Sequence, residues 1–152
     1  MDEQMMDWTY DSMCFACGEQ NPIGLHLKFE RVDEETVRTT FVPALYHQSW
    51  PGIMHGGLTA LIADELMGRC VNVLGYAGVT ARMELRYKHA VPLEEAVTFE
   101  AKAVRVRLPI IDLEARAILT DGSTALEASA RFMVKARYEE FIAQLAEEAA
   151  QR

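Results

Sequence analysis

The fold of this chain is decided by the stretch His55-Gly56-Gly57-Leu58-Thr59-Ala60-Leu61-Ile62-Ala63-Asp64-Glu65. Two glycines open it, and apolar residues then occupy almost every side of a helical wheel as far as about Leu74. A helix that is apolar on nearly every side is one that other structure surrounds. Two carboxylates lie inside it, and a buried carboxylate without a partner is costly. We therefore expect an enclosed helix over 56–74 that carries chemistry as well as packing.

The segments around this helix have the pattern of half-buried strands. Apolar and polar residues alternate over 25–29, 36–42, 80–89, 95–108, 110–120 and 126–134, as strands with one buried face require. The buried positions change parity near Ala103, which predicts a β-bulge. Asp121-Gly122 is typical of a hairpin turn, and the pattern over 138–150 predicts an amphipathic surface helix.

The order of these segments predicts an α+β fold. Two strands come first, then the enclosed helix, then four meandering strands. A long antiparallel sheet needs one face covered, so we expect a curved antiparallel sheet of about six strands wrapped around one long central helix. This domain is expected over 23–137, after an irregular segment over 1–22 and before a C-terminal surface helix over 138–152. The open face or edge that remains favours a homodimer.

Length and composition exclude several classes of protein. The chain has 152 residues, half of them apolar, and a formal net charge of −8. These values suit one globular domain and argue against a binder of nucleic acid or of membrane surfaces. No apolar run is long enough to span a membrane, and the acidic first residues are unlike a signal peptide. Three cysteines do not make a disulfide framework, so we expect a cytoplasmic protein without a nucleic-acid or membrane partner.

The start of the predicted helix has the features of an oxyanion site. The first backbone N–H groups of a helix lack intrahelical partners, and the helix dipole favours an anion beside them. Gly56 and Gly57 let a substrate approach this backbone closely, so that the N–H groups polarise a carbonyl. The simpler interpretation is a tight turn followed by a solvated acidic stripe, and the apolar residues around Asp64 and Glu65 argue against it.

The spacing of the motif indicates a site between two chains. Asp64 follows Gly57 by nearly two helical turns, so both lie on one face at a separation of about 10 Å. Reacting atoms must approach within about 3–3.5 Å, which favours Gly57 and Asp64 of different subunits at one carbonyl. Adjacent helix positions point about 100° apart, so only one of Asp64 and Glu65 faces a substrate, and the spacing favours Asp64.

At these residues the chain resembles a known family. His55-Gly56-Gly57 with Asp64, followed by Gly78-Val79-Thr80, Tyr87 and Pro92-Leu93, is similar to the hotdog-fold acyl-CoA thioesterases of the 4-hydroxybenzoyl-CoA thioesterase superfamily, phenylacetyl-CoA-type branch. The stretches 14–18 and 21–25 resemble another branch, and the resemblance covers about 14–135. It implies the hotdog fold and the hydrolysis of an acyl-CoA to a free acid and coenzyme A, with no metal or separate cofactor.

The resemblance also implies roles for individual residues. Asp64 is the general base or nucleophile, and the Gly57 N–H holds the thioester oxygen. His55 positions the substrate carbonyl or the catalytic loop, and Thr80 orients the attacking water. Where the branch has an asparagine six residues before the histidine, this chain has a serine, and the neighbouring Gln48 is the candidate that places the water.

Further side chains are candidates for substrate binding. Those beside the motif are Gly56, Glu65 and Trp50. Of these, Trp50 is placed to line an acyl pocket. A group of cations on one strand face suits the phosphates of coenzyme A, although a solvated strand face has the same pattern; these cations are Arg82, Arg86 and Lys88.

Other functions and a metal site stay open at this point. Cys14-x-x-Cys17 has the spacing of half a zinc site, but the second half is missing, so we expect packed cysteines and no metal. An enoyl-CoA hydratase or dehydratase is an alternative enzyme on this fold, and a non-catalytic acyl-CoA-binding module is an alternative that does not need the acid at Asp64. The pattern names neither the acyl group nor the choice between a homodimer and a homotetramer built as a dimer of dimers.

Overall fold

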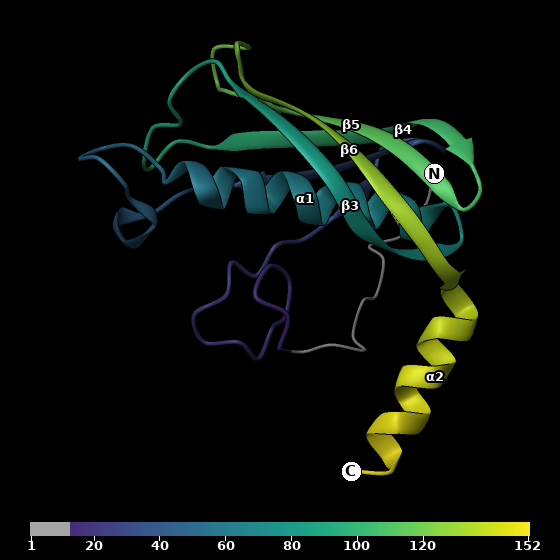
Figure 1. Ribbon diagram of the computed structural model, residues 1–152. Coiled ribbons are helices and arrows are strands. Elements are labelled where there is room, and N and C mark those ends of the chain that lie inside the picture. The colour runs from purple at the N-terminus through teal and green to yellow at the C-terminus, as the bar shows by residue number, and fades with distance from the viewer. Residues whose placement is uncertain (1–12) are drawn as a thin grey trace.

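The structure is a computed structural model that describes residues 13–152 (Figure 1). Its elements, in chain order, are β1 (Glu30–Arg31), β2 (Thr36–Phe41), the 3-10 turn η1 (Leu45–His47), α1 (Gly56–Val73), β3 (Tyr76–Tyr87), β4 (Val97–Arg107), β5 (Ile110–Ile118), β6 (Thr124–Arg137) and α2 (Tyr138–Ala150). The strands form one antiparallel sheet in the order β1-β2-β4-β5-β6-β3. Most of the irregular segment expected over 1–22 lies outside the described residues.

Helix α1 lies across one face of the sheet, which curves around it (Figure 1). The centre of this contact is fully buried, with Ile62 and Leu66 of α1 against apolar side chains such as Phe99 of β4. Burial alternates along β4, β5 and β6, so each strand turns its apolar side toward the helix. The expected sheet around one central helix is confirmed. The C-terminal helix α2 is confirmed too, and it has no buried residue.

The four strands after α1 are not the meander that we expected. Strand β3 pairs with β6 at one edge of the sheet, whereas β4 pairs with β2 and continues through β5 to β6. Helix α1 carries the chain from β2 to the far edge, and the hairpin-linked strands β4, β5 and β6 then fill the sheet between. The alternation of apolar residues shows which face of a strand is buried but not which strand lies beside it. The predicted meander was therefore wrong. Among the described strands, β3 has a partner on one side only.

Local irregularities of the sheet agree with the sequence at several points. The register of β4 with β5 shifts between Ala103 and Arg105, which confirms the predicted bulge. Gly122 has a φ of +85° in the hairpin turn predicted at that point. A further register shift lies beside Gly78, where an added Cβ would stand 2.8 Å from the Met133 carbonyl oxygen. Strand β3 therefore lies against β6 at a spacing that only glycine permits.

The first predicted strand differs from the expected one. Leu25, Leu27 and Phe29 are buried in the expected alternation, but β1 itself covers only Glu30–Arg31. The Leu25 and Leu27 N–H groups donate to carbonyls of Phe15 and Ala16 instead of to β2. Residues 13–24, which we name the N-terminal knuckle, are thereby tied to this segment and pack on the core through Ala16.

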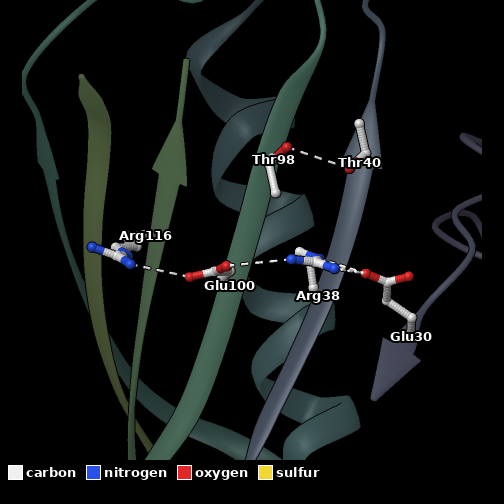
Figure 2. Close-up of polar contacts among 6 residues, drawn as sticks. All are labelled: Glu30, Arg38, Thr40, Thr98, Glu100 and Arg116. Atoms are coloured by element: carbon white, nitrogen blue, oxygen red, sulfur yellow. Dashed lines mark hydrogen bonds and ion pairs between the residues drawn. The ribbon is translucent and has the colours of Figure 1, made fainter. Parts of the chain in front are cut away.

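The outer face of the sheet, away from α1, carries rows of paired charges. One row crosses β1, β2, β4 and β5, where Arg38 lies between Glu30 and Glu100, and Glu100 also pairs with Arg116 at 3.1 Å (Figure 2). A groove of about 980 Å³ runs over this face and has side chains of both signs along it. Because these cross-strand pairs are charged, the outer face is polar and suited to contact with water. Within residues 13–152, no helix has the length and apolar character needed to cross a membrane.

Candidate active site

The N-terminus of α1 is capped by the histidine of the opening motif. His55 precedes the helix with an extended backbone, and its Nδ1 accepts a hydrogen bond from the Gly57 N–H at 2.9 Å. A neutral ring that accepts at Nδ1 carries its proton on Nε2. A Cβ at Gly57 would lie 3.0 Å from this nitrogen, so glycine lets the ring approach. The Gly57 N–H that we expected to face a thioester oxygen is thus held by His55 in this structure.

A tyrosine from the edge strand holds the first residue of α1. The Tyr87 hydroxyl donates to the Gly56 carbonyl at 2.9 Å, and a Cβ at Gly56 would lie 3.3 Å from the Tyr87 ring. Tyr87 belongs to the family pattern, but the pattern gives it no role in the site. Its spacing from the helix start gives no sign of the contact, because β3 returns along α1 only in the folded sheet.

Asp64 and Thr80 are brought together from different elements. Asp64 is half-buried on α1, and the Thr80 hydroxyl of β3 donates to its Oδ1 at 2.6 Å. A hydrogen bond of this length to a carboxylate is charge-assisted and holds the carboxylate in one orientation. Both side chains lie beside the sheet edge that β3 leaves without a partner strand among the described residues.

The loop before His55 is folded back on itself by its own polar groups. Gln48 Oε1 accepts from the Gly52 N–H at 2.8 Å, and His47 Nδ1 accepts from the Ala44 N–H at 2.8 Å. Burial lowers the pKa of His47 below its ordinary value. The candidate Gln48 therefore uses its oxygen within the loop and keeps its amide NH₂ group as the donor toward a ligand. Trp50 is 78% exposed at the tip of this loop.

Glu65 and the basic residues of β3 lie away from Asp64. Glu65 pairs with Arg69 at 2.7 Å on the side of α1 that faces the N-terminal knuckle, so it is not brought together with Asp64. The cations proposed for phosphate binding alternate with Met83 and Leu85, which pack on the core, and so occupy the outer face. Two of these cations already pair with acids of that face, Arg82 with Glu84 and Lys88 with Glu127, whereas Arg86 lines the outer groove.

Comparison with known proteins assigns the fold. The family model of the thioesterase superfamily matches residues 51–125, which include the α1 motif and β3. Acyl-coenzyme A thioesterase THEM4 of Bos taurus is 30% identical over 89 residues, which is 58% of this chain. The match covers 36% of that relative, so this chain spans little more than a third of its length.

Solved structures agree with this assignment. The crystal structure of a thioesterase superfamily protein superimposes with a TM-score of 0.76 at 26% identity, over 88% of this chain and 68% of that one. A hypothetical thioesterase protein from Streptococcus pneumoniae, solved with coenzyme A, has a TM-score of 0.70 at 21% identity over 73% of this chain and 87% of that one. The E. coli PaaI protein from the phenylacetic acid degradation operon has a TM-score of 0.70 at 14% identity over 74% and 82%. The chain therefore has the hotdog fold, and its segment 51–125 matches the thioesterase superfamily.

Proposed function

We propose that this protein hydrolyses an acyl-CoA thioester to a free acid and coenzyme A, with Asp64 as the reacting carboxylate. The observation that carries the proposal is the 2.6 Å hydrogen bond from Thr80 to Asp64 beside the open edge of the sheet. The thioesterase superfamily match over residues 51–125 and the bovine acyl-coenzyme A thioesterase support the reaction class. The S. pneumoniae thioesterase that was solved with coenzyme A supports coenzyme A as the carrier of the acyl group.

The proposed reaction uses the two oxygens of Asp64 differently. Thr80 holds Oδ1, and Oδ2 accepts a proton from the water that attacks the thioester carbonyl. The carbonyl electron pair moves onto oxygen and returns as the C–S bond breaks, and the coenzyme A thiolate then takes the proton. If Asp64 is instead the nucleophile, it forms an anhydride that water cleaves. Rapid-quench mass spectrometry distinguishes the two, because only the anhydride leaves an acyl group on the protein.

The Gly57 N–H is the proposed donor to the oxyanion. In the structure it donates to His55 Nδ1, and a neutral imidazole nitrogen is a weaker acceptor than a developing oxyanion at a helix N-terminus. We expect the thioester oxygen to replace His55 Nδ1 as the acceptor during the reaction. His55 would then present its Nε2–H to the substrate, and Gln48 would offer its amide to the water. The Tyr87 hydroxyl holds the start of this helix through its hydrogen bond to the Gly56 carbonyl.

The proposed site needs two copies of the chain. Gly57 and Asp64 are about 10 Å apart along α1, whereas one carbonyl must meet both. The open edge of β3 offers a place where a second copy can bring its helix alongside. In this homodimer, Trp50 and the loop around it face the acyl group. The cytoplasmic location, the dimer of dimers and the phosphate-binding role of Arg82, Arg86 and Lys88 stay predictions.

Mixed dimers test the arrangement of the site. A subunit with Asp64→Asn is combined with a subunit carrying Gly57→Val, each inactive as its own homodimer. If the site is shared, one of the two sites in each mixed dimer has both residues intact, and thiol release returns. If each chain contains its own site, the mixture stays inactive, and the shared site is refuted.

The function itself is tested by measuring free-thiol release over a panel of short, long and aromatic acyl-CoAs. Asp64→Asn should lose about two to four orders of magnitude in kcat with one of these substrates, as expected for a lost general base. Glu114→Gln, an exposed acid on the outer face of β5, is the matched control and should keep full activity. Binding of acyl-CoA without turnover would favour the non-catalytic binding module, and equal rates for wild type and Asp64→Asn would refute the mechanism.

A further inference from the structure

A second cluster of reactive side chains lies where the N-terminal knuckle covers α1. The knuckle contributes Cys14 and Cys17, and α1 contributes Glu65 and Arg69. The two sulfur atoms and a Glu65 carboxylate oxygen all lie within 4.8 Å of one another. Arg69 Nη2 donates to Cys17 Sγ at 2.9 Å and to Glu65 Oε1 at 2.7 Å. This cluster is separate from the Asp64 and Thr80 pair.

The surroundings of these cysteines favour a thiolate. Arg69 is only 6% exposed, and its guanidinium lies 5.2 Å above the Phe29 ring, so its charge acts on the Cys17 sulfur with little screening by water. The hydrogen bond from the Cys17 thiol lowers the pKa of Cys14 to about 6, and the proton retained in this bond raises the pKa of Cys17. Both cysteines are half-buried and not sealed in the core, which is the setting of reactive cysteines.

The position of Arg69 decides between a metal ion and thiol chemistry. Within residues 13–152 the cluster offers three ligand groups, and a structural zinc site takes four. Arg69 Nη2 already lies at bonding distance from two of the three, Cys17 Sγ and Glu65 Oε1. A divalent cation placed there would stand against a buried guanidinium. Arg69 therefore already supplies a positive charge at the place in this cluster that a metal ion would occupy.

We propose that Cys14 and Cys17 are a redox-active dithiol that exchanges with small-molecule disulfides. The Cys14 thiolate attacks one sulfur of the disulfide, which forms a mixed disulfide and releases one thiolate. The Cys17 sulfur then attacks Cys14, so that the Cys14–Cys17 bond forms, the mixed disulfide breaks, and the second thiolate leaves with the Cys17 proton. Two electrons pass from the cysteine pair to the small disulfide. Reduction by a dithiol reverses the step.

The hydrogen bond between the two cysteines gives the pair an asymmetry that can be measured. At pH 6 a thiol of pKa about 6 is half ionised, whereas an ordinary cysteine is ionised to well under 1%. The lower intrinsic nucleophilicity of the more acidic thiol offsets part of this difference. Cys14 should therefore react with glutathione disulfide about tenfold faster than the cysteines of the unfolded chain at pH 6, and only about twofold faster at pH 7.

The experiment follows the reaction of the intact protein with glutathione disulfide by mass spectrometry. The wild type should lose two hydrogens and keep one thiol, Cys70, whose pKa burial raises to about 12. Cys17→Ser should stop at a glutathione adduct on Cys14, and Cys14→Ser should react no faster at pH 6 than the unfolded chain. The proposal is overturned if Cys17→Ser gains no adduct, if the wild type forms no disulfide, or if the purified protein carries zinc that protects both thiols. Because none of these readings uses an acyl-CoA, they stand independently of the thioesterase assay.

Discussion

The hydroxyl of Thr80 is the group whose removal tests the site most selectively. Thr80→Val keeps the shape and the β-branched character of the side chain but removes the donor that lies 2.6 Å from Asp64 Oδ1. A hydrogen bond to a charged group contributes about 1.5–3 kcal/mol. Thr80 is exposed and Asp64 only half-buried, so we expect the lower end of that range, which corresponds to a fall in kcat of about tenfold.

The assay compares kcat and KM for the best acyl-CoA of the panel. Because Thr80 contacts the carboxylate and not the acyl chain, kcat should fall while KM stays within about twofold. Thr80→Ser should restore most of the rate. Thr98→Val is a matched control, since it removes a threonine hydroxyl that contacts Thr40 at 3.3 Å on the outer face (Figure 2). Wild-type kcat in Thr80→Val, or an equal loss in Thr98→Val, would refute the role given to this hydrogen bond.

Three further predictions concern stability. Gly78→Ala should cost about 1–3 kcal/mol of unfolding free energy in urea, because its Cβ would meet the Met133 carbonyl at 2.8 Å; an unchanged midpoint would contradict the close approach of β3 and β6. Tyr87→Phe should cost about 0.5–1.5 kcal/mol through the lost bond to the Gly56 carbonyl, and an unchanged melting temperature would count against that contact. Burial raises the pKa of Cys70 to about 12, so above about pH 8.5 the unfolded chain loses this proton first. Stability should then fall with rising pH by up to about 1.4 kcal/mol per unit between about 8.5 and 12, and Cys70→Val should remove that part of the slope in urea titrations at several pH values.

The sequence pattern predicts the helices and strands of this fold but not how the strands are arranged in the sheet. The apolar pattern after Gly56 predicts α1 as far as about Leu74, and the helix ends at Val73. The parity change near Ala103 predicts the bulge. Both are local properties of a buried face. The pairing of β3 with β6 is not local, because it depends on where α1 delivers the chain. Similarly, the alternation over 25–29 predicts burial correctly, while the partner of that segment is the knuckle and not β2.

At the candidate site, the family pattern identified the residues but not all of the contacts between them. The pattern singled out Asp64 and Thr80, which the fold brings into contact, but not the cap that His55 places on Gly57. That bond depends on the ring orientation, which no spacing encodes. The pairing of Arg69 with Glu65 had a signal in the sequence: a cation one turn after an acid, in a largely apolar helix. Cys17, which also accepts a hydrogen bond from Arg69, comes from a segment far away in the chain.

The adjacency of Asp64 and Glu65 explains why one helix can carry two kinds of chemistry. Their side chains leave α1 about 100° apart, and each direction meets a different neighbour. Glu65 points under the knuckle, where buried Arg69 neutralises it and takes a cysteine sulfur as a further acceptor. Asp64 points to the edge strand, where a single hydroxyl holds it and no cation is paired with it among the described ion pairs. Within the described part of the chain, the carboxylate of Asp64 therefore carries its charge without a paired cation, whereas that of Glu65 is neutralised by Arg69. The rotation between two neighbouring residues therefore places one acid at the proposed thioesterase site and the other beside the cysteine pair.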